Sequence, residues 1–179
     1  MSSSAGGESC STKGQCVGAP ALPGSSLPLQ GDESLMTKKG QFGSTATPVQ
    51  GSLRYGISQS LANRICCFNR HYAEPSGSFE GTTFFADVNK TGETTFYDSV
   101  TGKPLFIAPR GRSYDSWIAE SRSHGWPSFR DAEVVWDDVR CLPDGECVSL
   151  AGTHLGHNLP DRHGNRYCIN LCSVAGNAV

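Results

Sequence analysis

The spacing of apolar residues predicts two helices. Before residue 75, apolar side chains recur every three or four residues, which predicts one face of a helix that ends near Pro75 and Gly77. This apolar face consists of Leu61, Ile65, Phe68 and Tyr72. A second, shorter helix is predicted near residues 114–122. Its apolar face consists of Tyr114, Trp117 and Ile118.

From residue 82 the pattern changes to short runs rich in β-branched and aromatic residues, separated by Gly, Asp, Asn and Pro. The runs lie at 82–85, 94–97, 105–108, 134–136 and 147–150, and a further run at 166–171 alternates polar and apolar residues. This spacing is typical of antiparallel strands joined by turns. We therefore predict a mainly β fold of two packed antiparallel sheets with a few short peripheral helices.

Composition divides the chain near residue 50. Residues 1–50 are rich in Gly, Ser and Pro and contain a single aromatic residue, Phe42. Such a segment cannot bury enough apolar area to offset the entropy lost on ordering. We predict a flexible segment over residues 1–50 and one domain over residues 51–179, a length that can form its own core.

Charge and hydropathy narrow the range of partners. The net charge is −2 and charged residues make up 18% of the chain, so bulk electrostatics give no reason to expect nucleic acid or a membrane surface. No apolar run approaches the roughly 18 residues that span a bilayer. The N-terminus also lacks the basic and apolar regions of a secretory signal. We expect a monomeric cytoplasmic protein with no nucleic-acid or membrane partner.

The run at 166–171 combines a thiol with polar neighbours. Arg166, Cys168 and Asn170 share one face of the predicted strand, and apolar residues share the other. A cation near a thiol favours the thiolate, which is the nucleophilic form. An amide can donate a hydrogen bond to a developing oxyanion. This face therefore predicts a reactive cysteine.

Two histidines precede that strand. His154 and His157 would fall on opposite faces of a regular strand, but Gly156 favours a bulge that brings both to one side. A hairpin through 160–165 would then lay both rings against Cys168, and Cys with His is the usual arrangement for activating a thiol or protonating a leaving group. A zinc site is the rival interpretation, which the lack of Cys-x-x-Cys spacing disfavours. Its ligands would be Cys147, His154, His157 and Cys168.

Four motifs occur in a fixed order between residues 78 and 176. They are a segment at 97–106 ending in Gly-Lys-Pro-Leu-Phe, Gly-Trp-Pro-Ser-Phe at 125–129, His-Leu-Gly-His at 154–157 and Arg-Tyr-Cys-Ile-Asn at 166–170. In these motifs the chain resembles the B-type methionine sulfoxide reductases (MsrB family). The resemblance implies a fold of two antiparallel sheets and reduction of methionine-R-sulfoxide, free or in proteins. It also implies no bound cofactor and an external reductant such as thioredoxin or another dithiol.

The resemblance also implies roles for individual residues. Cys168 would be the nucleophile, and Trp126 would form the apolar wall that receives the substrate methyl group, although Trp126 could equally be a core residue. The residues that would line the site are His154, His157, Arg166 and Asn170. Phe129 and Asp161 would contribute to substrate binding, with Asp161 bracing Arg166.

The chain departs from the family pattern at two places. Many relatives bind zinc through two Cys-x-x-Cys pairs. The aligned positions hold Asp98, Thr101, Val148 and Ala151. We therefore predict a zinc-free domain. Many relatives also carry their recycling cysteine directly before the Gly-Trp-Pro-Ser-Phe motif, where this chain has His124.

A second thiol for recycling must therefore come from elsewhere. A regular strand would place Cys172 about 13 Å from Cys168, whereas a disulfide needs Cα atoms about 4.4–6.8 Å apart. Cys66 and Cys67, which helical geometry places off the apolar face, are the predicted resolving residues. A one-cysteine cycle stays open, as do two other functions on the same fold: an inactive ligand- or peptide-binding module and a thiol redox sensor.

Turn chemistry makes a separate prediction for Cys141 and Cys147. The Leu-Pro-Asp-Gly sequence at 142–145 suits a type I turn with Gly in the left-handed bulge conformation. A three-residue loop would place Cys141 directly opposite Cys147 on the neighbouring strand. We expect these two thiols to be able to bridge each other, which makes either one a poorer resolving partner for Cys168.

Overall fold

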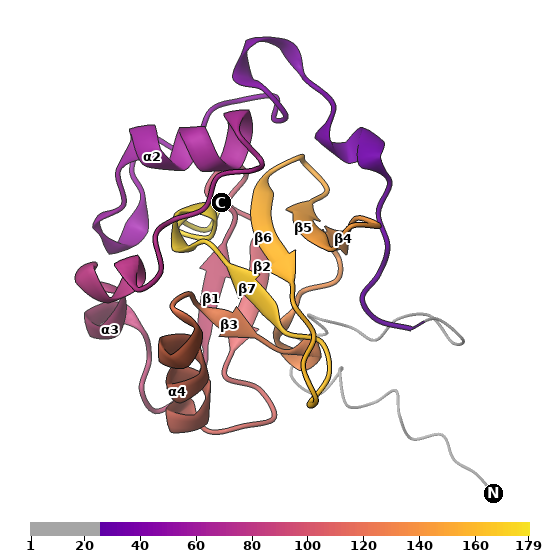
Figure 1. The fold of residues 1–179 in the computed structure, drawn as a ribbon. Helices are drawn as coiled ribbons and strands as arrows, with labels where there is room; N and C mark the ends of the chain where they lie inside the picture. The colour runs from indigo at the N-terminus through magenta and orange to yellow at the C-terminus, as the bar shows by residue number, and fades with distance from the viewer. Residues whose placement is uncertain (1–25) are drawn as a thin grey trace, which may run out of the picture.

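The computed structural model describes residues 26–179, which form two antiparallel sheets with short helices at their margin (Figure 1). The smaller sheet pairs β1 (Thr94–Tyr97) with β2 (Pro104–Ala108). The larger sheet has the strand order β3-β7-β6-β5-β4. Its strands are β3 (Ser128–Phe129), β4 (Val139–Cys141), β5 (Glu146–Ser149), β6 (His154–Asn158) and β7 (Tyr167–Ile169). Helix accounts for about 29% and strand for about 21%, so the two antiparallel sheets are confirmed in a fold that is mixed rather than mainly β.

The helices lie along one side of the sheets (Figure 1). They are α2 (Gln59–Asn63), α3 (Phe84–Asp87) and α4 (Tyr114–His124). The predicted helix near 114–122 is confirmed as α4, which begins where the Ser113 side chain accepts a hydrogen bond from the Ser116 amide. It ends at Gly125, whose φ of 93° is the left-handed conformation that glycine allows at a helix terminus. Residues 26–179 contain no helix long and apolar enough to cross a membrane.

Two of the predicted strands are wrong. Residues 82–85 enter α3 because the Thr82 hydroxyl accepts a hydrogen bond from the Phe84 amide, a local bond that favours a turn over a strand. Residues 134–136 form only one isolated bridge, between Val134 and Phe106. The chain then turns, with the Asp138 amide bonded to the Val135 carbonyl.

The first predicted helix is shorter than its apolar spacing indicates. After α2 the chain forms a π-helix over Arg64–Phe68, and the helical structure ends before Asn69 rather than near residue 75. A π-helix has more residues per turn than an α-helix and therefore changes which side chains face inward. Cys66 and Cys67 are buried, whereas Phe68 is 57% exposed. The prediction that both cysteines lie off the buried face is therefore wrong.

The core lies between the two sheets and is built on aromatic contacts. Phe106 of β2 stacks on Phe129 of β3 with ring centroids 4.4 Å apart, and Phe96 of β1 meets Phe129 edge-on at 5.5 Å. Trp117 of α4 is fully buried against the same ring. Such pairs add to the stabilisation that burial itself provides. This packing fixes β3, and through it β7, against the smaller sheet.

The prediction of a flexible segment over residues 1–50 is wrong for residues 26–50; residues 1–25 lie outside the described part of the chain. Strand β4 is an edge strand of the larger sheet, and residues 29–31 cover it. The Cys141 amide donates to the Leu29 carbonyl over 2.9 Å, and the Gly31 amide donates to the Cys141 carbonyl over 2.8 Å. Met36 is buried against Leu142 and Val148. Covering an exposed edge is a contribution that composition does not reveal.

Candidate functional site

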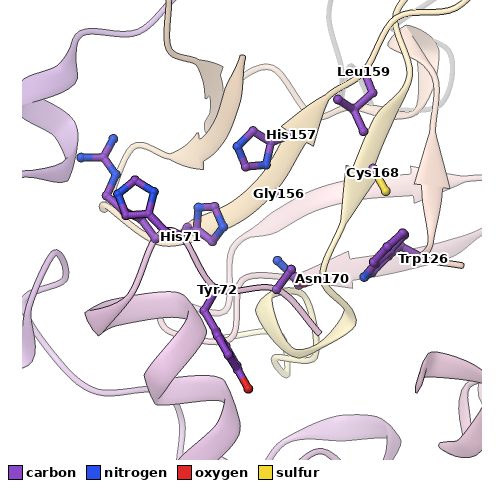
Figure 2. A pocket seen from close by; sticks show the side chains of 11 residues that line it. His71, Tyr72, Trp126, Gly156, His157, Leu159, Cys168 and Asn170 are labelled. Carbon is purple, nitrogen blue, oxygen red and sulfur yellow. The ribbon is translucent and has the colours of Figure 1, made fainter. Parts of the chain in front are cut away.

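A cavity of about 190 Å³ opens where β6, β7 and the segment 70–73 meet. Five predicted site residues line it: Trp126, His154, His157, Cys168 and Asn170. The rest of the wall is Arg70, His71, Tyr72, Ala73, Gly156 and Leu159. Figure 2 shows the Cys168 sulfur on the β7 side, with Trp126 and Leu159 nearby and His157 on the adjacent strand. The predicted residues that lie outside the wall are Phe129, Arg166, Asp161, Cys66 and Cys67.

Cys168 lies at the centre of its strand, opposite Ser128 of β3 and His157 of β6. Its thiol is half-buried. Burial raises the pKa of the Cys168 thiol, and the charge and hydrogen bond of the Arg166 side chain only partly oppose that increase. Arg166 therefore lowers the pKa of the thiol, as expected, but the net shift of the Cys168 pKa is upward because burial has the larger effect. In the free protein, the thiol is mainly protonated at neutral pH.

The predicted bulge between the histidines is present in β6. Val148 of β5 pairs with His154, and Cys147 pairs with Gly156, so Leu155 is the additional residue. The bulge brings the His154 and His157 rings to the same cavity, with centroids 5.8 Å apart. A Cβ atom on Gly156 would lie 2.0 Å from the Cys168 carbonyl oxygen. Only glycine therefore allows β7 to approach β6 this closely.

The sequence reasoning missed the carboxylate that holds His154. Glu146 of β5 is buried, and its Oε2 lies 2.7 Å from His154 Nδ1. Its Oε1 accepts a hydrogen bond from Arg70 Nε over 3.0 Å. Burial raises the pKa of the Glu146 carboxyl, but the hydrogen bonds and charges of His154 and Arg70 outweigh it and leave the pKa below its usual value. The alternation of residues 146–149 does not predict the contact between Glu146 and His154, because that contact depends on the bulge in β6.

His157 differs from His154 in its surroundings. Its side chain is exposed at the mouth of the cavity, and no described residue forms a hydrogen bond with either ring nitrogen. Partial burial lowers the pKa of His157, and the neighbouring His154 lowers it further. His157 is therefore neutral at pH 7.

Arg166 is buried beside the thiol, and its Nε and Nη1 have no hydrogen-bond partner among the described residues. The expected bracing by Asp161 is at long range, since Asp161 Oδ2 lies 3.9 Å from Arg166 Nε. Asp161 instead accepts two hydrogen bonds from Arg130, over 3.0 and 2.9 Å. These bonds hold the pKa of the Asp161 carboxyl well below its usual range. Phe129, expected in substrate binding, is a fully buried core residue.

Asn170 and Trp126 form hydrogen bonds with the backbone of Glu74, directly after the segment 70–73 that lines the cavity. The Asn170 Oδ1 accepts a hydrogen bond from the Glu74 amide over 2.9 Å, and its Nδ2 donates to the Leu155 carbonyl over 3.2 Å. The Trp126 indole N–H donates to the Glu74 carbonyl over 2.9 Å. This bond fixes the orientation of the Trp126 ring in the cavity wall. Asn170 retains one N–H that can serve a ligand.

The other described cysteines lie away from the cavity wall. Cys141 and Cys147 are directly opposite each other, as the turn predicted, with their Sγ atoms 3.4 Å apart. Cys66 Sγ lies 3.7 Å from the Cys172 carbonyl oxygen. Cys67 Sγ accepts a hydrogen bond from Thr45, and burial raises the pKa of Cys67 to about 11. The resolving role of Cys66 or Cys67 stays a prediction that would require a rearrangement.

Asp98, one of the four positions compared above with zinc ligands, forms a hydrogen-bonded contact with Thr153. Asp98 is buried, and its carboxylate accepts hydrogen bonds from the Thr153 hydroxyl over 2.9 and 3.1 Å. This contact joins the β1–β2 turn to the β5–β6 turn. Across residues 26–179, no group of three or more His, Cys, Asp or Glu side chains is placed to hold a metal ion.

Comparisons of the chain with protein-family models and with curated proteins gave no match. What the cavity does is therefore inferred from its own side chains and from the order of the four sequence motifs.

Proposed function

We propose that this protein reduces methionine-R-sulfoxide to methionine, with Cys168 as the nucleophile. One observation carries the proposal: a single small cavity is lined by a half-buried thiol, two histidines and an indole ring. An apolar face suits the methyl group of the substrate, and the thiol and imidazoles suit the polar sulfoxide. The four motifs that resemble the B-type methionine sulfoxide reductases include each of these residues.

The chemistry follows from the order in which the groups act. The Cys168 thiol gives its proton to the histidine pair, and the resulting thiolate attacks the sulfoxide sulfur and forms a sulfur–sulfur bond. The histidine pair passes that proton to the sulfoxide oxygen. The hydroxyl is then transferred to the Cys168 sulfur as methionine departs with its electron pair. The products are methionine and a Cys168 sulfenic acid, so the substrate is reduced by two electrons and the cysteine is oxidised by two.

Recycling then consumes two thiols. A second thiol condenses with the sulfenic acid, which releases water and forms a disulfide. A dithiol reductant such as thioredoxin exchanges with that disulfide and restores the Cys168 thiol. The substrate is oxidised methionine, free or in proteins, and no bound cofactor is required by these steps.

The decisive experiment measures the rate at which the protein reduces each epimer of an amino-blocked methionine sulfoxide, with dithiothreitol as reductant. The intact chain should reduce the R epimer and leave the S epimer unchanged. The Cys168→Ser variant should retain the far-UV circular dichroism spectrum and lose all turnover of the R epimer. Reduction of the S epimer alone, or turnover by Cys168→Ser above a few per cent of the parent, would contradict the proposal.

A further inference from the structure

One histidine of the cavity belongs to a series of paired charged side chains that begins at Arg70, which also lines the cavity. Arg70 follows the π-helix, Glu146 lies in β5, and His154 lies in β6. The side chains of Glu146 and His154 are 4% and 2% exposed, and each carboxylate oxygen of Glu146 faces one partner. Arg70 is also ion-paired with the exposed Glu33 of the N-terminal segment.

The chemistry of these partners fixes the proton on His154. An ionised carboxylate only accepts hydrogen bonds and a guanidinium only donates them. Because Glu146 is paired with Arg70 and buried, it is retained as a carboxylate, and the contact at His154 Nδ1 must be an N–H donated to Oε2. That leaves Nε2 as the ring nitrogen available to the cavity, where it can hold or deliver a proton.

On the basis of the proposed function, we infer that Glu146 and Arg70 are positioning residues for His154. Neither residue needs to contact the sulfoxide for this role: Glu146 lies outside the cavity wall and acts through the imidazole. Glu146 fixes the tautomer and orientation of the ring, and Arg70 fixes the carboxylate. His157, which lacks any such partner among the described residues, is free to rotate at the mouth of the cavity.

The substitution Glu146→Gln has a consequence specific to this arrangement. Arg70 can only donate, so the carbonyl oxygen of the new amide must turn toward Arg70 and its NH2 group toward His154. The amide then donates to Nδ1, and the proton of the neutral ring moves to Nε2. Removing Arg70 as well, in Glu146→Gln combined with Arg70→Met, frees the amide to accept from Nδ1 again. The tautomer change should therefore appear in the single variant and disappear in the double variant.

Nitrogen-15 NMR of histidine-labelled protein tests the arrangement without any activity measurement. The experiment uses the full chain in a Cys168→Ser background, with the His154 signals assigned by His154→Gln. Nδ1 of His154 should be protonated in this parent, unprotonated in Glu146→Gln above pH 8, and protonated again in the double variant. An unprotonated Nδ1 in the parent would overturn the inference, and this result does not depend on whether Glu146→Gln folds.

Activity with the R epimer supplies the second readout, in chains that keep Cys168. Glu146→Gln should lower kcat at least about tenfold, less than the roughly 100-fold or more that an acid–base group itself contributes because the His154 imidazole remains, and should change KM less than about twofold. The matched control is Glu133→Gln, which removes another buried, arginine-paired carboxylate, one that lies outside the cavity wall and has no contact with either histidine. Equal kcat losses in both variants, or none in Glu146→Gln, would overturn the inference. A chain without R-epimer reduction that nevertheless shows the tautomer changes would refute the proposed function and leave the positioning of His154 standing.

Discussion

The Cys168 thiol experiences two opposing influences from its surroundings. Burial in the sheet disfavours the thiolate, and the adjacent Arg166 favours it, with burial the larger effect. The free protein therefore keeps most of this thiol protonated at neutral pH, and its reactivity should increase as the pH rises. A sulfoxide in the cavity would displace water next to the thiol and place the histidine pair at its oxygen.

Substituting Arg166 tests this balance. In Arg166→Gln the favourable charge is lost, so the pKa of Cys168 should rise further and less thiolate should be present at pH 8. Alkylation of Cys168 by iodoacetamide, followed by mass spectrometry, should slow about three- to tenfold, since one pKa unit corresponds to about tenfold in thiolate. In both proteins the rate should still be increasing between pH 8 and pH 9. Arg122→Gln, on the exposed side of α4, is the control. Equal rates in Arg166→Gln and the parent would show that Arg166 does not act on the thiol.

Among the elements, the β4–β5 hairpin places two features side by side. Its turn aligns Cys141 with Cys147, and the residue directly before Cys147, Glu146, carries the carboxylate that accepts a hydrogen bond from His154. Both thiols are buried, and burial raises the pKa of Cys147 well above its ordinary value. Buried thiols are poorly accessible to other reactants, so we expect the pair to react slowly while the hairpin stays closed.

Mapping disulfides after one turnover tests whether Cys141 or Cys147 forms a disulfide with the oxidised Cys168. The protein is reacted with one equivalent of the R epimer in the absence of reductant, and free thiols are then blocked in acid. Peptide mass spectrometry should show no bond between Cys168 and either hairpin cysteine, because both lie away from the cavity wall. Any hairpin disulfide should join Cys141 to Cys147, whose Sγ atoms are 3.4 Å apart. A Cys168–Cys147 or Cys168–Cys141 bond would assign the resolving role to the hairpin instead.

The sequence predicted those elements whose cause is local. Turn residues at 142–145 gave the cysteine register, and Gly156 gave the bulge that gathers the two histidines. It did not predict the π-helix, because apolar spacing assumes a regular helix, and it therefore placed Cys66 and Cys67 on the wrong face. Glu146 was missed for a related reason: its contact with His154 depends on pairing across a bulged strand, which no single segment encodes.

At the scale of the whole molecule, the N-terminal segment completes the larger sheet. Residues 29–31 cover the β4 edge, and in Figure 1 the indigo segment runs beside β4. Glu33, two residues after this segment, is ion-paired with Arg70, which in turn pairs with Glu146, the partner of His154. Because this surface ion pair is exposed, its own contribution to stability should be small. The burial of Met36 against Leu142 and Val148 should contribute more to the stability of this segment than the ion pair does.

Replacing Met36 measures that attachment directly. Met36 packs in a small cluster with Leu142 and Val148, so Met36→Ala should lower the free energy of unfolding by about 2 kcal/mol, the lower range for truncating a buried methionine. Urea unfolding followed by tryptophan fluorescence is the measurement, and an unchanged m-value would show that the loss belongs to the folded domain. Lys38→Ala, two residues away and exposed, should change the free energy by less than about 0.5 kcal/mol. If the two substitutions had equally small effects, the segment around Met36 would not be part of the folded domain in solution. A loss confined to Met36→Ala would place the N-terminal boundary of the domain before residue 36.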